Sequence, residues 1–173
     1  MPTFEHVLTE RLDLRRPDPV ADLAALFSVF TDPDGWWYDP AGRHRDEDTT
    51  RGWLERAAAR FDRDGLSYWT VRRRDTAEII GVGGAQRQST GAWNLNYRIA
   101  SDQQGKGFAT ELARAAQSAA SSLDPDVPFI AWIAANNEPS RKVAERLGLT
   151  NHGPGVDPSD GRQRIAYADR PFA

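Results

Sequence analysis

The stretch Ile99-Ala100-Ser101-Asp102-Gln103-Gln104-Gly105-Lys106-Gly107-Phe108-Ala109-Thr110 joins a strand-like segment to a helix-like one. Residues 95–99 before it have the character of a strand, and residues 111–123 after it are rich in alanine, with apolar side chains at helical spacing. The first turn of a helix has unpaired backbone N–H groups and the positive end of the helix dipole, so it attracts anions. Gly105 and Gly107 let a phosphate approach the backbone, and the lysine between them adds a positive charge. The stretch therefore predicts a phosphate-binding turn.

Two familiar phosphate-binding motifs do not fit this turn. A P-loop needs a longer glycine loop that ends in Gly-Lys-Ser or Gly-Lys-Thr, whereas Lys106 is followed by Gly107. The dinucleotide-binding motif needs three glycines over six positions at the first strand–helix turn, whereas this turn lies beyond the middle of the chain. A Gly-x-Gly pair before a helix also occurs at ordinary tight turns, so the interpretation depends on a second motif.

The second motif follows the short apolar segment 129–133 and reads Asn137-Glu138-Pro139-Ser140-Arg141-Lys142-Val143-Ala144-Glu145-Arg146-Leu147-Gly148-Leu149. Local preferences predict a helix here, because Asn137 suits the capping position, Pro139 the first turn and Gly148 the position after the end. The alternative interpretation is a surface helix that only packs its apolar side chains against a core.

Together the two motifs resemble those of the GNAT acyl-CoA N-acyltransferases. Gln104 to Ala109 is similar to that family's Gln/Arg-x-x-Gly-x-Gly/Ala signature, and the second motif is similar to the Asn-x-x-Ser…Leu-Gly-Phe helix of the branch resembling ribosomal-protein N-terminal acetyltransferases. Leu8 to Arg15 is similar to that branch's opening strand, so the resemblance covers nearly the whole chain. It implies one GNAT domain over residues 1–173 with an α+β fold: a mostly antiparallel sheet of about six or seven strands, helices on both faces, and fourth and fifth strands that splay apart.

The resemblance also implies an activity and a coenzyme site. We expect an N-acetyltransferase that transfers the acetyl group of acetyl-CoA to a primary amine, by direct attack in a ternary complex and without a metal. Residues 99–101 would contact pantetheine, residues 104–110 would surround the pyrophosphate, and the second motif would face the pantetheine arm or a phosphate. The residues expected at the coenzyme are Ile99, Ala100, Ser101, Gln104, Gly105, Lys106, Gly107, Phe108, Ala109, Thr110, Asn137, Ser140 and Arg141.

The chain departs from the family pattern at two catalytic positions. Many GNAT enzymes carry a glutamate base on the fourth strand and a tyrosine acid on the second-motif helix, whereas this chain has Asn94 and Ala144 there. Ser140 remains as a candidate catalytic residue that donates to the departing sulfur or to a water, with packing or capping as its alternative role. Without a base, catalysis would depend on positioning an amine that is already neutral, which favours an acceptor of low pKa. An α-amine with a pKa of about 7.7–8.0 is roughly a tenth neutral at pH 7. The alternative function is a CoA-binding sensor or regulatory protein with little or no activity.

A run of aromatic residues marks the candidate acceptor site. It lies in the Pro- and Gly-punctuated loop 31–46, where it either covers a core or lines a cleft. The residues expected to bind the acceptor are Trp36, Trp37, Tyr38 and Asn94. Three nearby aspartates either attract a positively charged acceptor or form turns, namely Asp32, Asp34 and Asp39. The three histidines show no metal-ligand spacing and are interpreted as solvated surface: His6, His44 and His152.

Length and composition limit the number of domains and the kinds of partner and chemistry that the protein can have. A length of 173 residues suits one α/β domain, and a net charge of −3 argues against a nucleic-acid-binding surface. The absence of cysteine excludes disulfides, thiolate nucleophiles and cysteine metal sites. No apolar run is long enough to span a bilayer, and the first residues lack the apolar core of a signal peptide. We therefore expect a cytoplasmic monomer or homodimer without a nucleic-acid or membrane partner.

Periodicity and turn residues predict the other elements. A loose lead-in precedes a strand, two amphipathic helices and a hairpin, and a further strand ends the chain. The expected ranges are 1–7 for the lead-in, 11–15 for the strand, 20–30 and 48–64 for the helices, 67–73 and 78–86 for the hairpin, 92–99 and 129–133 for the following strands, 149–153 before a loop, and 164–168 for the last strand. Glycines 81, 83 and 84 inside a strand predict a bulge or a close backbone approach.

Overall fold

One mixed sheet organises the structure, a computed structural model that describes residues 2–172. Within these residues its eight strands lie in the order β1-β2-β3-β4-β5-β6-β8-β7, and every neighbouring pair is antiparallel except β5 and β6. The strands are β1 (His6–Leu8), β2 (Leu12–Arg15), β3 (Tyr68–Arg73), β4 (Ile79–Arg87), β5 (Trp93–Ile99), β6 (Phe129–Ile133), β7 (Thr150–Val156) and β8 (Gln163–Ala168).

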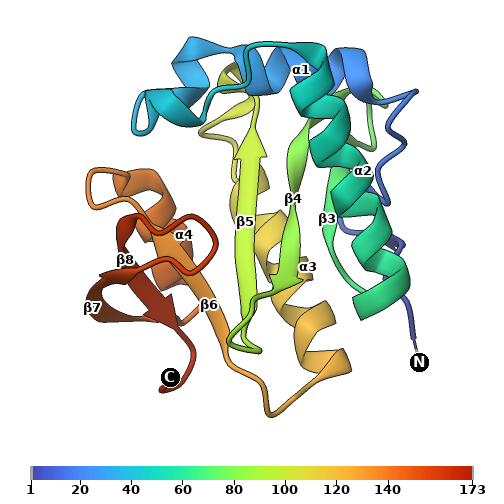
Figure 1. The fold of residues 1–173 in the computed structure, drawn as a ribbon. Coiled ribbons are helices and arrows are strands. Elements are labelled where there is room, and N and C mark those ends of the chain that lie inside the picture. Colours follow the sequence, from blue (N-terminus) through green and yellow to red (C-terminus); the bar gives the residue numbers. More distant parts are fainter. Residues whose placement is uncertain (1, 173) are drawn as a thin grey trace.

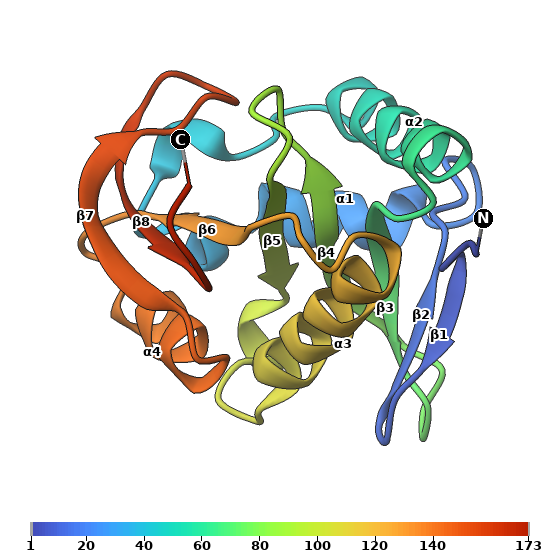
Figure 2. The same cartoon turned by 90° about the horizontal axis from the view of Figure 1, so that it is seen from below.

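Helices cover both faces of this sheet. Figure 2 shows α1 and α2 on one face and α3 and α4 on the other. The helices are α1 (Leu23–Thr31), α2 (Glu47–Asp64), α3 (Phe108–Leu123) and α4 (Glu138–Arg146), with 3-10 turns at Pro33–Trp36, Pro40–Gly42 and Ser101–Gln103. None of the helices in residues 2–172 combines the length and the apolar character that a membrane span requires. The predicted α+β class with a mostly antiparallel sheet is confirmed.

Several element boundaries differ from the predictions. The lead-in contains a short edge strand, β1, which pairs with β2 and brings the strand count above the expected six or seven. β7 continues to Val156 through residues predicted as a loop, because a register shift between Asn151 and Pro154 accommodates the proline on an edge strand. α1 begins at Leu23 rather than at residue 20, since Asp18 first forms a turn by accepting hydrogen bonds from two backbone N–H groups.

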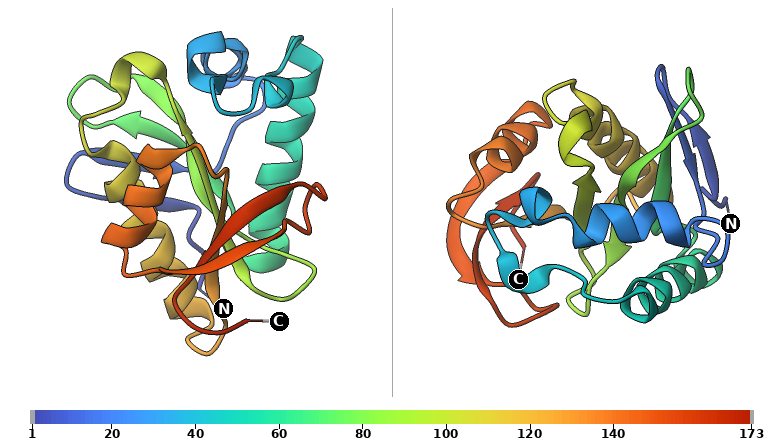
Figure 3. Two further views of the ribbon diagram at one scale, coloured as in Figure 1. Left: turned by 90° about the vertical axis from the view of Figure 1, so that its left-hand side faces the viewer. Right: turned by 90° about the horizontal axis from the view of Figure 1, so that it is seen from above.

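The parallel strands β5 and β6 separate soon after they meet, as the expected splaying of the central strands requires. They pair only at Trp93 with Phe129 and at Asn94 with Ile130. Beyond these pairs β5 stays with β4 up to Ile99, while β6 pairs with β8. Figure 1 shows the gap between β5 and β6, and the left view of Figure 3 shows β7 and β8 lying across the sheet direction.

The glycines of β4 allow its neighbours to approach closely. A Cβ atom on Gly81 would lie 2.1 Å from the carbonyl oxygen of Arg98, and one on Gly83 would lie 2.5 Å from Cδ2 of Leu112 in α3. The β3–β4 pairing also shifts register between Val71 and Arg72. Both expectations for these glycines, a bulge and a close approach, are therefore confirmed.

We expect Gly81→Ala to lower the free energy of unfolding by about 1–3 kcal/mol, because the added methyl group meets backbone that cannot move without separating β4 from β5. Denaturant unfolding measures this change. Gly52→Ala is the matched control: in helix α2 its Cβ would meet only the flexible end of Arg56, 3.2 Å away, and alanine favours a helix interior. This control should stabilise the protein, and equal effects of the two substitutions would contradict the packing argument.

Candidate active site

The glycine turn lies at the N-terminus of α3. Gly105 and Gly107 have φ angles of +77° and +84°, in the left-handed region that favours glycine. No side chain caps the helix, so its first N–H groups stay available to a ligand. Arg11 fixes the turn from outside, since its guanidinium donates to the carbonyl of Lys106 at 2.8 Å and to Glu111 at 2.7 Å.

A cavity of about 500 Å³ opens at this turn, and we name it the turn cavity. It is bounded by the glycine turn, the end of β5 and the start of α4, as the resemblance implies for a coenzyme site. Of the residues expected at the coenzyme, those that line it are Ile99, Gln104, Gly105, Gly107, Phe108, Ala109, Thr110, Asn137 and Ser140. Asn137 also caps α4, because its side chain accepts a hydrogen bond from the N–H of Ser140.

Four residues expected at the coenzyme do not line the turn cavity. Ser101 donates to Asp32 at 2.6 Å, and Lys106 donates to Gln103 at 3.3 Å. Ala100 donates its N–H to a carbonyl of β4, and Arg141 donates to the hydroxyl of Tyr167 at 3.0 Å.

The cations of α4 that face the turn cavity are Lys142 and Arg146 rather than Arg141. Helical spacing could have found them, because positions 139, 142, 143 and 146 share one face of the helix and all four line the cavity. Lys142 and Arg146, and not Arg141, are therefore the α4 cations that border the turn cavity.

A second cavity of about 340 Å³ lies on the other side of the gap, and we name it the aromatic cavity. The phenyl, phenol and indole rings that line it belong to Phe30, Trp36, Tyr38, Trp53, Tyr68, Tyr97 and Trp132. Three of the four residues expected to bind the acceptor line it, namely Trp36, Tyr38 and Asn94. Trp37 does not: its half-exposed side chain lines the turn cavity instead.

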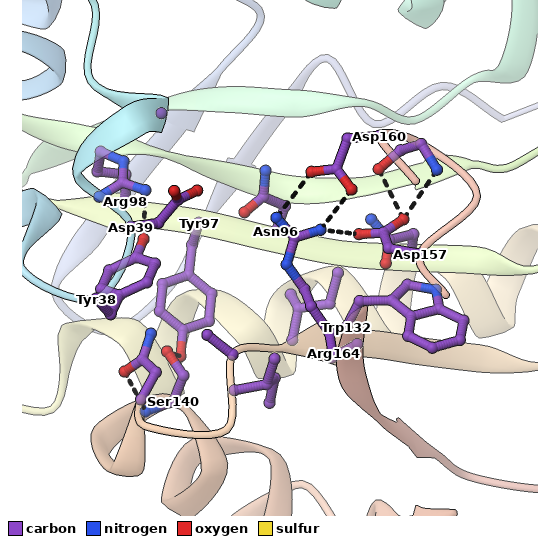
Figure 4. Close-up of a pocket in the computed structure, with 18 of the residues that line it drawn as sticks. Tyr38, Asp39, Asn96, Tyr97, Arg98, Trp132, Ser140, Asp157, Asp160 and Arg164 are labelled. Atoms are coloured by element: carbon purple, nitrogen blue, oxygen red, sulfur yellow. Dashed lines mark hydrogen bonds and ion pairs between the residues drawn. The ribbon is translucent and has the colours of Figure 1, made fainter. Parts of the chain in front are cut away.

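Every carboxylate that lines the aromatic cavity has an arginine partner. Arg164 contacts Asp157 at 2.6 Å and Asp160 at 2.7 Å, and Arg162 pairs with Asp39. Figure 4 shows Arg164 extending into the cavity toward the two aspartates of the β7–β8 loop. Asp39 thus forms an ion pair, whereas Asp32 accepts hydrogen bonds from Asp34 N–H and from Ser101, which fits the turn-forming alternative.

The two cavities meet where Tyr97 and Ser140 face each other. Residues that line both are Tyr38, Tyr97, Arg98, Asn137 and Ser140. The Tyr97 hydroxyl donates to Oγ of Ser140 at 3.1 Å, across the space between β5 and α4 (Figure 4). Burial raises the pKa of Tyr97 to about 12, so the phenol remains a proton donor at neutral pH. No motif in the sequence marks Tyr97 as a site residue.

Arg98 fixes the loop that covers this junction. Its guanidinium donates to the carbonyl of Gly35 at 2.7 Å and to the hydroxyl of Tyr38, and its Cζ lies 3.2 Å from the centroid of the Trp36 ring. Burial lowers the pKa of Arg98 below its ordinary value. The contact joins residues 63 positions apart, and no local pattern in the sequence marks it.

A family model described as an acetyltransferase (GNAT) domain matches residues 11–150. The chain belongs to the GNAT acetyltransferase family. The uncharacterized protein YkkB of Bacillus subtilis (strain 168) is similar to it, with 29% identity over 147 residues, which cover 83% of this chain and 84% of YkkB.

Solved structures show the same GNAT fold. An acetyltransferase from Agrobacterium tumefaciens str. C58 superposes with a TM-score of 0.79 at 24% identity, over 99% of this chain and 97% of its own. RimL, a ribosomal L7/L12 alpha-N-protein acetyltransferase solved in complex with coenzyme A, gives 0.71 at 18% identity, over 94% and 95% of the two chains. As a GNAT protein, the chain is an acyl-CoA-dependent N-acetyltransferase.

One histidine of this GNAT protein lies in the site rather than on the surface. His44 stacks on Phe30 with 4.1 Å between ring centroids, places Nδ1 2.8 Å from the Thr50 hydroxyl, and lines the aromatic cavity. The interpretation of His44 as a solvated residue was therefore wrong. Burial, and then the positive charges of Arg98 and Arg56, lower its pKa to about 4, so the imidazole is neutral at pH 7.

We expect His44 to make stability depend on pH. Between its ordinary pKa of 6.5 and its folded value of about 4, the unfolded chain binds a proton that the folded protein does not, so lowering the pH over this range favours unfolding. Denaturant unfolding across this range should show a steeper loss of stability for the wild type than for His44→Gln, and NMR should show His44 titrating near pH 4. Equal pH slopes for the two proteins would contradict this assignment.

Proposed function

We propose that the enzyme transfers the acetyl group of acetyl-CoA to a primary amine by direct attack while both substrates are bound. The observation that carries this proposal is the meeting of two different cavities at Tyr97 and Ser140. One cavity has the glycine turn and the helix N-terminus needed for phosphates, and the other has aromatic and polar walls. A thioester in the first and an amine in the second would approach each other at the shared residues.

Acetyl-CoA fits the turn cavity by its chemistry, and the family uses this coenzyme. The pyrophosphate would lie on the first N–H groups of α3, with Gln104 beside it and the charges of Lys142 and Arg146 near the phosphates. Pantetheine would follow the edge of β5 beyond Asn94, which β6 leaves unpaired. Its amide groups would pair with those of the strand, since buried backbone groups need hydrogen-bond partners.

The chemistry requires a neutral amine and a proton for the departing sulfur. Asn94 stands where many GNAT enzymes carry a glutamate, and its amide cannot accept a proton. Water would therefore take the proton of the attacking amine. Ser140 would donate its proton to the thiolate as it leaves and would take up the proton that water received from the amine, so that the hydroxyl is restored. Tyr97 would orient Ser140 by donating to its oxygen. This arrangement favours an acceptor of low pKa, either a protein N-terminal α-amine or a weakly basic small amine.

We expect acetyl-CoA to raise the melting midpoint by several degrees, since a ligand at 100 times its Kd stabilises the fold by about 2.7 kcal/mol. Arg146→Ala should weaken acetyl-CoA binding about tenfold through loss of a charged phosphate contact. Arg141→Ala removes the same charge from the same helix outside the cavity and should leave the affinity unchanged. Thermal melting and calorimetry measure both effects.

The absence of any acetyl-CoA shift in folded protein would overturn the coenzyme site. Equal loss of affinity in the Arg141 and Arg146 variants would contradict the orientation of α4. Binding without release of free CoA, over a panel of amines, would instead support the alternative function, a CoA-binding sensor or regulatory protein.

We expect Ser140→Ala to lower kcat by about 10- to 100-fold, at or below the lower end of a general-acid contribution, because water can replace the hydroxyl in part. Tyr97→Phe keeps Ser140 but removes the hydroxyl that orients it, so kcat should fall less in this variant than in Ser140→Ala. Steady-state kinetics at saturating acetyl-CoA measure both. In the wild type, kcat/KM for the amine should follow the acceptor's own pKa; an enzyme group titrating between about pH 6 and 7 would reveal a base outside this mechanism.

A further inference from the structure

The aromatic cavity carries a more specific inference, which rests on the proposed function. We infer that the acceptor is a small, singly charged, weakly basic amine with a flat aromatic body, and that Oδ1 of Asn94 accepts a hydrogen bond from one of its N–H groups. Four features of the cavity lead to this class: an unpartnered oxygen, the shape of the walls, the balance of charge, and the position of an ion pair between the two loops that line it.

The unpartnered oxygen belongs to Asn94. This residue is 8% exposed and lines the aromatic cavity at the last residue pair before β5 and β6 separate. Among the buried side-chain polar atoms of residues 2–172, only its Oδ1 has no hydrogen-bond partner. A buried carbonyl oxygen without a donor costs free energy that a ligand N–H would recover. Because Asn94 lines the cavity, the donor inferred for this oxygen is an N–H group of the molecule that fills the cavity.

The walls favour a flat body. Trp53 stacks on Tyr68 with centroids 5.6 Å apart and an interplanar angle of 11°. Tyr38, Trp53 and Trp132 line the cavity and are only partly buried, so they retain aromatic surface that a ligand can cover. A planar ring can stack on such surfaces or meet their edges, and it gains more from them than an aliphatic ring of similar volume.

The charges of the cavity cancel. Three carboxylates line it, from Asp39, Asp157 and Asp160, and so do three guanidinium groups, from Arg98, Arg162 and Arg164. Each carboxylate is held in an ion pair, so a polyamine would find no free partner for its additional charges. The cavity is therefore suited to an acceptor with a single amine.

The Asp39–Arg162 ion pair limits the length of the acceptor. It joins the segment between α1 and α2 to the β7–β8 loop, and both side chains line the aromatic cavity. Asp39 is 21% exposed and Arg162 44%, so the pair lies where the cavity meets solvent. A volume of about 340 Å³ suits a small ligand, and a longer peptide chain that left the cavity on this side would have to displace the pair.

Three acceptors with the same kind of α-amine test this class. Phenylalaninamide has the flat body, 3-cyclohexylalaninamide has an aliphatic ring in its place, and the hexapeptide Phe-Gly-Gly-Gly-Gly-Gly has the flat body on a longer chain. We expect kcat/KM for phenylalaninamide to exceed that of each of the others, and of spermidine, by at least about tenfold. Equal or better use of the cyclohexyl compound, the hexapeptide or spermidine would overturn the inference.

Two variants test the residues. Arg162→Ala should raise kcat/KM for the hexapeptide relative to phenylalaninamide, because it removes the ion pair between the loops. Asn94→Leu should raise the KM for phenylalaninamide about tenfold or more, because the substitution removes the oxygen that accepts the hydrogen bond of the acceptor. A merely structural asparagine would instead lower the melting midpoint and leave KM unchanged. Asn136→Leu changes an exposed amide that lines neither cavity and should change neither quantity.

The outcomes separate this inference from the proposed function. Acetylation of the hexapeptide alone, with a normal acetyl-CoA shift in thermal melting, would overturn the acceptor class and leave N-acetyl transfer standing. Loss of the acetyl-CoA shift together with no acetylation of any amine would overturn the proposed function itself.

Discussion

The separation of β5 from β6 after two residue pairs is the constraint on which the site depends. A continuous parallel pair would fill the gap with backbone hydrogen bonds and leave no path between the two faces of the sheet. Because the strands diverge after Asn94, the edge of β5 stays unpaired up to Ile99, and β6 turns toward β8. The two cavities can meet only because this gap exists. The glycines of β4 complete the arrangement, since they allow β4 to follow β5 and α3 to pack closely against the sheet.

The local features of the chain were largely predictable. The positive φ angles at Gly105 and Gly107, the capping of α4 by Asn137 and the turn at Gly148 each follow from a few neighbouring residues. The hairpin β3–β4 and the strand Phe129–Ile133 were likewise visible as short-range patterns. The start of α1 was predicted too early, because Asp18 forms a turn before the helix begins instead of capping it.

The parts of the site that sequence reasoning missed are contacts between distant residues. Tyr97 and Ser140 are 43 positions apart, Arg98 and Gly35 are 63 apart, and Arg162 and Asp39 are 123 apart. Such pairs are set by the packing of whole elements, so neither composition nor spacing indicates them. His44 illustrates the same limit: beside Asp46 and two arginines it resembles a surface residue, whereas the fold stacks it on Phe30.

The contacts of Arg98 differ in kind from those at the outer side of the aromatic cavity. Arg98 binds a backbone carbonyl, a phenol and an indole ring, none of them a carboxylate, whereas Asp39 and Arg162 form a partly exposed ion pair. Dissolved ions screen the exposed pair and have less influence on a partly buried guanidinium whose partners are not carboxylates. The wall beside the turn cavity therefore keeps its shape as the ionic strength of the medium varies, while the outer link between the loops loosens as salt rises.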